Sequence, residues 1–407
     1  MNLYLNDMIY AVSQALDAVE YEFAGAVVHH SHRVAFISVS LLTAMKGTTD
    51  PMPLLSLAAA ASMHDSGLTA YYRSYPSRLL DVNTISQTPY FKQHCIEGEE
   101  NLKAVPFCDG ARDAVLYHHE TADGYGPFGL RAEETPLYAR LIHLADVLDV
   151  TFSLGEVSMD KCDRVRSFAA QNTGSLFDRE TAEAFLDIFD LDHFQMLGNG
   201  CVLGELNRSL PQKQTDMSFE TLTRIADVVA KITDYKSTFT SNHSRGIAAK
   251  AERMAQSYGY SSDLCSLVYI AGAFHDIGKL YVPTEILEKP GRLTEDEFDK
   301  MKYHALATSE VLGNIRGFEQ IRHWAGNHHE KLDGTGYPYG LTGDRLDFID
   351  RLIGCVDIYQ ALTEFRPYRN SNGHAEAISI LRGMAGNHKI DSGIVEDLNK
   401  VLCGGDI

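Results

Sequence analysis

The amino-acid sequence predicts an all-α protein made of two helical bundles in tandem. Apolar residues recur at spacings of three and four along much of the chain, which is typical of amphipathic helices. We find no series of residues with the period-2 alternation that is typical of strands. One order of histidines and aspartates occurs twice, about 210 residues apart, and a duplication of this length indicates one bundle in each copy.

The first helix is predicted over residues 2–24, where apolar residues follow the helical spacing. The segment from His29 to Ala35 is followed by a second helical run that extends to Met45, and an Ala-rich segment covers residues 54–63, just after two prolines. The same succession returns in the second half, where Ser218 is the expected N-cap of a helix.

The duplication is defined by five pairs of residues at offsets of 210 to 213. The pairs are His30 and His243, His64 and His275, His94 and His304, His118 and His328, and Asp146 and Asp357. With the histidines that follow His118 and His328, ten of the 17 histidines fall on repeated positions, so a chance scatter is excluded. We predict an N-terminal domain over residues 1–197, a polar connector over 198–216 and a C-terminal domain over 217–407.

Composition limits the classes of function. A formal net charge of −19 argues against a nucleic-acid polymer as partner, although metals and local cations can attract a small anionic ligand. The seven cysteines form no CxxC pair, which is typical of free thiols in a reducing compartment. Neither a signal peptide nor an apolar run long enough for a membrane span is evident, so we expect a cytoplasmic protein without a membrane partner.

The repeated residues have the chemistry of metal ligands. Neighbouring histidines on a helix point about 100° apart, so His328 and His329 suit two adjacent ions better than one. A glycine-rich loop follows them, from Asp333 to Pro338, and suits a ligand-binding segment. Imidazole and carboxylate groups without thiolate favour Fe, Mn or Zn, and mixed sets of this kind are typical of two-metal hydrolases. The alternative is a set of surface or core histidines with no joint role.

The second copy resembles the HD-GYP branch of the HD-domain metal-dependent phosphohydrolases. The motifs that carry the resemblance are His275-Asp276-Ile277-Gly278-Lys279, His304, His328-His329-Glu330, Asp333-Gly334-x-Gly336-Tyr337-Pro338, Asp357 and Arg366-Pro367-Tyr368. They cover roughly residues 240–400. The resemblance implies an all-helical fold, two or three bound Fe or Mn ions, and hydrolysis of cyclic dinucleotides such as cyclic di-GMP.

The resemblance also implies roles for individual residues. The metal ligands would be His243, His275, Asp276, His304, His328, His329 and Asp357. Asp276 would bridge two ions whose shared hydroxide attacks the phosphodiester, and Lys279 would assist catalysis. The residues that would contact the substrate are Lys279, Tyr337, Arg366 and Arg369. Phe239 stands where some members have a glutamate for a third metal, so two ions are expected, and Gln360 stands where the family often has aspartate.

The first copy resembles a degenerate relative of the second. It keeps His30, His64, Asp65, His94, His118, His119 and Asp146. However, Leu68 replaces the lysine, the loop around Tyr125 is shortened, and no Arg-Pro-Tyr follows Thr151. A structural, dimerising or sensing role fits these changes, so a homodimer stays open. The alternative is an active HD phosphohydrolase with another substrate.

We therefore predict a metal-dependent phosphodiesterase that converts cyclic di-GMP or 3′3′-cyclic GMP-AMP to the linear dinucleotide. No residue distinguishes guanine from adenine. Three alternatives are an HD-fold phosphohydrolase of mononucleotides or alarmones, a di-iron oxygenase, and a metal-containing but catalytically weak receptor. The tyrosine loop and Arg366-Pro367-Tyr368 argue against the first, and Lys279 with the phosphate-directed arginines argues against the second. Gln360 keeps the receptor open.

Overall fold

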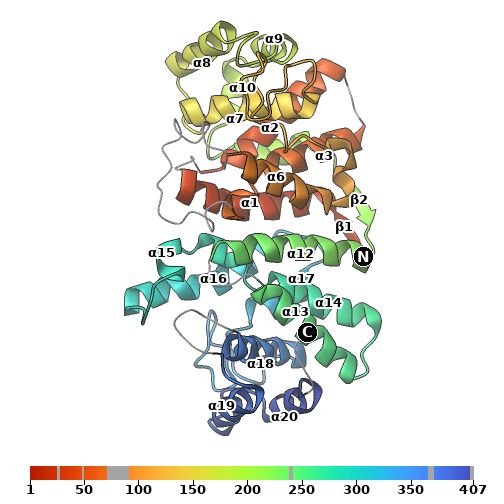
Figure 1. Ribbon diagram of the computed structural model, residues 1–407, viewed down its shortest axis with the longest axis vertical. Coiled ribbons are helices and arrows are strands. Elements are labelled where there is room, and N and C mark those ends of the chain that lie inside the picture. The colour runs from red at the N-terminus through yellow and green to blue at the C-terminus, as the bar shows by residue number, and fades with distance from the viewer. Residues whose placement is uncertain (25–27, 48–49, 71–90, 238–241, 365–370, 404–407) are drawn as a thin grey trace. The chain divides into compact units, whose positions relative to one another are not determined.

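The computed structural model of the protein describes residues 1–24, 28–47, 50–70, 91–237, 242–364 and 371–403. The chain divides into two compact units, Tyr4–Thr215 and Asp216–Ile407, and the second unit includes Met1–Leu3. Helices form nearly all of the regular structure in both units (Figure 1). The predicted all-α class is therefore confirmed.

Two short strands were not predicted. They are β1 (Asn2–Tyr4) and β2 (Gln214–Asp216), and they pair in a two-stranded sheet. The first helix consequently begins at Leu5 rather than at residue 2. Three residues are too few to produce a recognisable alternation, so sequence periodicity cannot reveal strands of this length.

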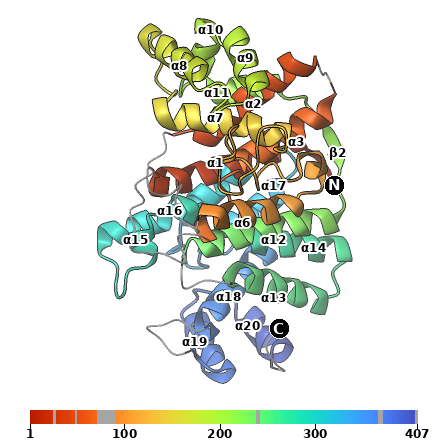
Figure 2. The ribbon, with the colours of Figure 1, turned by 45° about the horizontal axis from the view of Figure 1, so that its top comes forward.

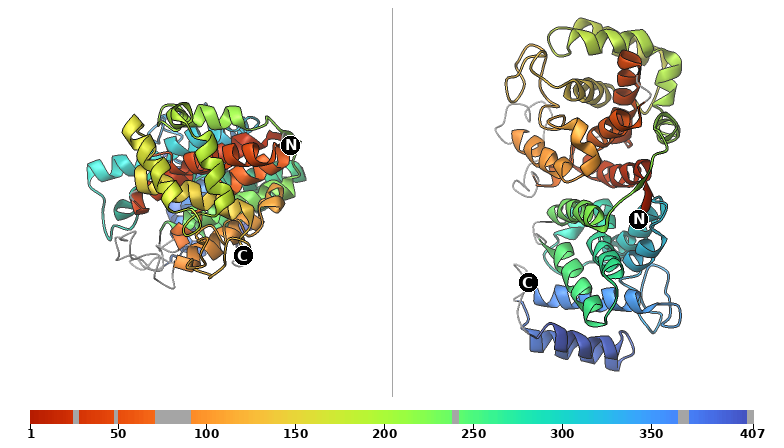
Figure 3. Two further views of the ribbon diagram at one scale, coloured as in Figure 1. Left: turned by 90° about the horizontal axis from the view of Figure 1, so that it is seen from above. Right: turned by 90° about the vertical axis from the view of Figure 1, so that its right-hand side faces the viewer.

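The N-terminal unit is organised around helix α2. The helical elements are α1 (Leu5–Ala24), α2 (His30–Lys46), α3 (Pro51–Ser62), α6 (Phe91–Lys103), η1 (Pro106–Ala111), α7 (Leu137–Phe152), α8 (Met159–Gln171), α9 (Arg179–Ile188), α10 (Leu191–Met196) and α11 (Val202–Ser209). Helix α2 packs against α1, α3, α7, α9 and α11. The right-hand view of Figure 3 shows the helices of this unit, coloured from red to yellow-green, gathered in one bundle. Nearly every residue from His30 to Leu42 is buried, as expected of a helix enclosed on all sides.

The C-terminal unit has its own core around α14 and α18. The elements are α12 (Phe219–Tyr235), α13 (His243–Ser257), α14 (Ser262–Phe274), η2 (Ile277–Tyr281), α15 (Thr284–Leu287), α16 (Glu295–Gly313), α17 (Glu319–Gly326), α18 (Phe348–Thr363), α19 (His374–Gly386) and α20 (Ser392–Val401). Helix α14 packs against α12, α13 and α17, and α18 packs against α13, α17, α19 and α20 (Figure 2).

The order of helices repeats between the units. The succession α1, α2, α3, α6, α7, α8, α9 corresponds to α12, α13, α14, α16, α18, α19, α20. The repeated histidines and aspartates fix this correspondence, because His30 and His243 are the first residues of α2 and α13. The segment predicted as a connector, 198–216, contains α11 and β2, and α11 packs on α2. Within the described ranges, no helix has the length and apolarity that a membrane crossing requires.

Candidate metal centre

The C-terminal unit brings the seven predicted metal ligands together from five places in the chain. His243 begins α13, His275 and Asp276 directly follow α14, His304 lies in α16, His328 and His329 follow α17, and Asp357 lies in α18. Their side chains are buried, except that His329 is partly exposed. At the N-terminus of α13, Asp234 accepts hydrogen bonds from Ser244 N at 3.0 Å and Ser244 Oγ at 2.7 Å, which anchors the start of the helix beside His243.

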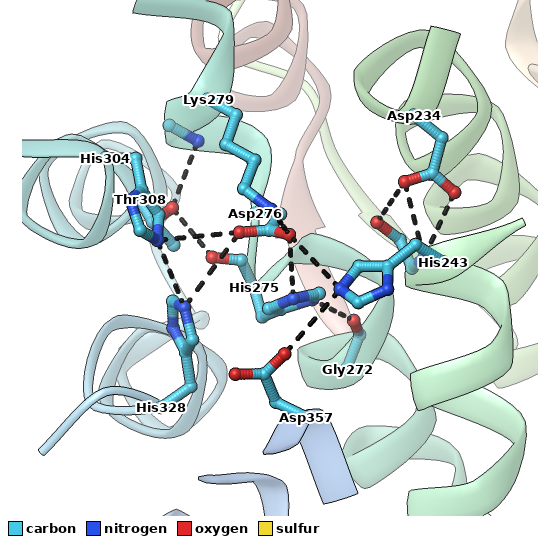
Figure 4. Close-up of polar contacts among 12 residues, drawn as sticks. Asp234, His243, Gly272, His275, Asp276, Lys279, His304, Thr308, His328 and Asp357 are labelled. Carbon is cyan, nitrogen blue, oxygen red and sulfur yellow. Dashed lines mark hydrogen bonds and ion pairs between the residues drawn. The ribbon is translucent and has the colours of Figure 1, made fainter. Parts of the chain in front are cut away.

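The Asp276 carboxylate lies between four imidazoles (Figure 4). Asp276 Oδ2 is 3.0 Å from His275 Nε2 and 3.8 Å from His243 Nε2. Asp276 Oδ1 is 3.5 Å from His304 Nε2 and 3.9 Å from His328 Nε2. One carboxylate therefore faces histidines on both of its oxygens, which is the arrangement that a bridging ligand needs.

Asp357 provides the second carboxylate of the cluster. Its Oδ1 is 3.6 Å from His243 Nε2, and its Oδ2 is 3.6 Å from His329 Nδ1. His304 Nε2 also lies 3.3 Å from His328 Nε2. The nitrogens of His304, His328 and His329 are close enough to one another to hold one ion jointly.

Backbone carbonyls orient three of the imidazoles. The Nδ1–H groups of His275, His304 and His328 donate to the carbonyl three residues earlier in the chain, at 2.7, 2.6 and 2.7 Å. Each bond leaves the Nε2 lone pair for the centre of the cluster. Carbonyls and carboxylates in this role commonly fix the tautomer of metal-binding histidines.

The electrostatics of the cluster suit a cation. Burial and neighbouring imidazoles lower the pKa of His328 to about 3, and burial lowers the pKa of His304 to about 4. Burial raises the pKa of Asp276, but His275 and Lys279 outweigh it and hold that pKa well below its usual range. Burial also lowers the pKa of His243, but the Asp357 and Glu364 carboxylates raise it to about 9. His304, His328 and His329 are thus neutral imidazoles and Asp276 and Asp357 are ionised carboxylates, as metal coordination requires.

Two buried polar atoms of the cluster indicate that it fits metal ions. His275 Nε2 and Asp276 Oδ1 have no hydrogen-bond partner among the residues that the structure describes. A buried polar atom without a partner costs about 1–3 kcal/mol, so such atoms call for an explanation. Divalent ions would satisfy both atoms, and the donor set matches Fe, Mn or Zn.

The structure describes two of the four residues that were predicted to contact the substrate. Lys279 Nζ lies 2.5 Å from Asp276 Oδ2, so an ammonium group stands beside the cluster. The Tyr337 ring packs over His329, with centroids 4.7 Å apart. Arg366 and Arg369 lie outside the described residues.

Two further residues support the cluster, and the sequence did not predict a role for either. Thr308 donates from Oγ1 to the His275 carbonyl at 2.9 Å and accepts Gly278 N–H at 3.0 Å. Glu330 accepts the N–H groups of Tyr339 and Leu341, at 2.7 and 2.9 Å, and so folds the glycine-rich loop. Position in the repeat offers a signal only for Glu330, which follows both histidine pairs as Glu120 does in the first copy.

The N-terminal unit contains a second cluster with nearly the same geometry. Asp65 Oδ1 is 3.6 Å from His94 Nε2 and 3.8 Å from His118 Nε2, and Asp65 Oδ2 is 3.6 Å from His64 Nε2. Asp146 Oδ1 is 3.3 Å from His30 Nε2, and Asp146 Oδ2 is 3.7 Å from His119 Nδ1. His64 Nε2 and His118 Nε2 are buried and lack a hydrogen-bond partner within the described part of the chain, as His275 Nε2 does. The donor set therefore fits a metal in this copy as well.

The surroundings of the two clusters differ. Glu120 folds the N-terminal loop by accepting Phe128 N–H and Leu130 N–H at 2.6 and 2.5 Å, as Glu330 does in the other copy. That loop is one residue shorter, so Tyr337 has no counterpart, and Tyr125 is 88% exposed. Leu68 is buried where Lys279 stands in the second copy.

Comparison with known proteins agrees with this architecture. The HD domain family matches residues 27–151 and 227–394. The chain is 31% identical over 408 residues to the 3′3′-cGAMP-specific phosphodiesterase 1 of Vibrio cholerae, which covers 97% of this chain and 91% of that protein. It is 34% identical over 169 residues to the cyclic di-GMP phosphodiesterase response regulator RpfG of Xanthomonas campestris, which covers 41% of this chain and 44% of that protein.

The fold also matches a solved structure over its whole length. The crystal structure of a cyclic GMP-AMP specific phosphodiesterase of V. cholerae (V-cGAP3) superposes with a TM-score of 0.68 at 21% identity, covering 100% of this chain and 99% of that one. At this identity the match supports the fold alone. The family match in both copies and the 31% identity over nearly the whole chain show that the chain belongs to the HD-GYP family of HD-domain phosphodiesterases, with two HD domains in tandem.

Proposed function

We propose that the C-terminal domain hydrolyses a cyclic dinucleotide to the linear dinucleotide, with 3′3′-cyclic GMP-AMP as the first substrate to consider and cyclic di-GMP as the second. The observation that carries the proposal is the convergence of the seven predicted ligands, buried or partly buried, with Lys279 and Tyr337 beside them. The relative that matches 97% of the chain is specific for 3′3′-cGAMP, which supports the order of the two substrates.

The chemistry follows from the donor set. Two Fe or Mn ions held by the seven residues would supply the Lewis acidity that activates water and polarises the phosphodiester. Asp276 presents one oxygen to His275 and the other to His304, so it would be the residue shared by both ions. Lys279 adds a positive charge beside Asp276, where an anionic phosphate would be stabilised. The Tyr337 ring covers His329 and offers an aromatic face to the ligand.

Turnover of separate substrates tests the proposal. The full chain, loaded with Mn(II) or Fe(II), is given 3′3′-cyclic GMP-AMP, cyclic di-GMP or cyclic di-AMP. We expect hydrolysis of at least one of the first two, with the linear dinucleotide as product. Asp276→Ala should abolish it, whereas Asp344→Ala, at an exposed loop position of the same unit, should leave it unchanged. A metal-loaded protein that hydrolyses none of the three would refute the proposal and favour a receptor.

A second activity is proposed for the N-terminal domain, namely metal binding without hydrolysis of cyclic dinucleotides. The observation that favours it is the cluster around Asp65, which keeps the ligand geometry but has no lysine at the position of Leu68. Elemental analysis of the full chain should show that Asp276→Ala still contains metal. Asp65→Ala should contain less metal than wild type, and the double variant should contain less than either single variant. Equal metal contents in wild type and Asp65→Ala would contradict a site in this copy.

A further inference from the structure

The first histidine of each cluster is held on its outer nitrogen by a carboxylate, but the carboxylates come from different positions. His30 Nδ1 lies 2.7 Å from Asp149 Oδ2. His243 Nδ1 lies 2.8 Å from Glu364 Oε2. By the repeat, however, the counterpart of Asp149 is Gln360, one helical turn before Glu364. The two copies therefore make the same contact with carboxylates from different positions of the repeat.

In the N-terminal copy the contact is part of a buried ion-pair network. Asp149 accepts Arg33 Nε–H at 2.6 Å and Leu154 N–H at 3.0 Å in addition to its bond with His30. Arg33 in turn donates to the Val28 carbonyl at 2.7 Å. Asp149 and Arg33 are both fully enclosed, so the arginine compensates the buried carboxylate charge.

The C-terminal copy lacks both members of that ion pair. Gly246 stands at the position of Arg33, and Gln360 at the position of Asp149. A Cβ atom at Gly246 would lie 2.7 Å from Gln360 Nε2, so the amide fills space that a larger side chain at 246 would need. Gln360 Oε1 is buried without a hydrogen-bond partner among the described residues, so it does not hold His243.

Glu364 supplies to His243 the carboxylate contact that Asp149 supplies to His30 in the other copy. It follows the last residue of α18 and lies four residues after Gln360, on the same face of the helix. Its side chain is 15% exposed, and its backbone N–H donates to the Gln360 carbonyl at 2.9 Å. Its low exposure and its contact with His243 distinguish the Glu364 carboxylate from a solvated surface carboxylate.

We propose that Glu364 is a positioning residue that holds the His243 imidazole for metal coordination, in place of the aspartate–arginine pair of the other copy. By accepting Nδ1–H, the carboxylate leaves the Nε2 lone pair facing Asp276 and Asp357, the two carboxylates of the cluster. The inference rests on the proposed function, because it requires His243 to be a metal ligand. It adds a residue outside the predicted ligand set.

The test measures metal affinity rather than turnover. The metal-free full chain is titrated with Mn(II) by calorimetry, and the N-terminal site serves as an internal reference that C-terminal variants do not alter. We expect Glu364→Ala to weaken the C-terminal affinity by about 10–100-fold, the usual effect of removing a carboxylate behind a metal-binding histidine. Glu364→Gln, which keeps the shape and loses the charge, should give a smaller loss.

A rescue variant distinguishes positioning from a general effect on folding. In Glu364→Ala combined with Gln360→Asp, a carboxylate stands where Asp149 stands in the other copy, so the affinity should recover at least in part. Glu396→Gln, which removes an exposed carboxylate paired with Arg382, is the matched control and should bind as wild type. Failure of Gln360→Asp to restore any affinity would overturn the proposal.

A third variant separates the two proposals. If His243→Ala weakens binding and both Glu364 variants bind as wild type, the positioning role is wrong and the ligand set stands. If His243→Ala itself has no effect, the proposed ligand set is wrong, and the role of Glu364 falls with it.

Discussion

At the scale of single residues, the two clusters differ most in the charge beside the central carboxylate. Lys279 Nζ lies 2.5 Å from Asp276 Oδ2, whereas the corresponding position of the first copy is the buried Leu68. An ammonium group stabilises a phosphate and the charge that develops on it during hydrolysis, and a leucine cannot. We therefore expect the lysine to affect the reaction without being needed for metal binding.

Replacement of this lysine tests its role. Lys279→Met should lower kcat/KM for the cyclic dinucleotide by about 10–100-fold, since a hydrogen bond to a charged group contributes roughly 1.5–3 kcal/mol. The metal content should stay within error of wild type by elemental analysis. Lys302→Met, which removes a more exposed lysine paired with Asp299, serves as the control. An unchanged kcat/KM, or a loss of metal, would contradict this role.

At the scale of elements, a glycine lets the turn after the His-Asp pair lie directly against the next helix. A Cβ atom at Gly278 would stand 2.0 Å from the His304 carbonyl oxygen and 2.7 Å from Thr308 N. Gly67 has the same relation to the His94 carbonyl oxygen, at 2.1 Å, in the first copy. This close approach brings Asp276 within 3.5 Å of His304, so the backbone geometry and the cluster depend on each other.

A methyl group at this contact should therefore disturb both stability and the site. Gly278→Ala should lower the free energy of unfolding by roughly 1–3 kcal/mol through overpacking, and should also weaken metal binding. Gly383→Ala, in the exposed part of α19 where no atom lies within 4 Å, should stabilise the protein by up to about 1 kcal/mol. Urea denaturation of the metal-free variants measures both changes. Equal effects of the two substitutions would rule out the close contact.

At the scale of the whole molecule, buried histidines in both units make the metal-free protein sensitive to acid. Burial lowers the pKa of six histidines, namely His118, His119, His143, His304, His328 and His329. The unfolded chain restores their pKa to about 6.5, so below that pH the unfolded state binds more protons. Their contribution to stability is present above pH 6.5 and is lost as the pH falls. His243 and Asp234, whose pKa values are raised to about 9 and about 6, oppose this trend in part.

The balance of these groups gives a measurable slope. Each fully depressed histidine contributes about 1.4 kcal/mol between pH 7.5 and pH 5.5, and His243 and Asp234 together oppose this by about 2 kcal/mol. The free energy of unfolding of the chelator-treated protein should therefore fall by roughly 6 kcal/mol over this range. Urea denaturation at the two pH values, with chelator present, measures the change. Loss of His328 and His118 together, as His→Gln variants, should flatten the slope. A stability that rises on acidification would contradict the explanation.

The sequence by itself determined the helical class, the duplication and which histidines and aspartates converge. These properties depend on local spacing and on residue type, because helix periodicity and the order of His and Asp are visible without knowledge of packing. Seven predicted ligands of the second copy indeed lie together, as do their seven counterparts in the first copy. The pairing of β1 with β2, and the helix α11, could not be predicted, because short segments carry too little periodic signal.

Only the tertiary structure decided which residues support those ligands. Sequence comparison marked Gln360 as a departure, but it could not show that Glu364, one turn later, reaches His243 Nδ1. Nor could it show that Gly246 and Gln360, which replace the Arg33–Asp149 pair of the first copy, are in contact. Their contact joins α13 and α18 across 114 positions of the chain. Helix packing sets such contacts, and the packing depends on all neighbouring side chains at once rather than on any local pattern.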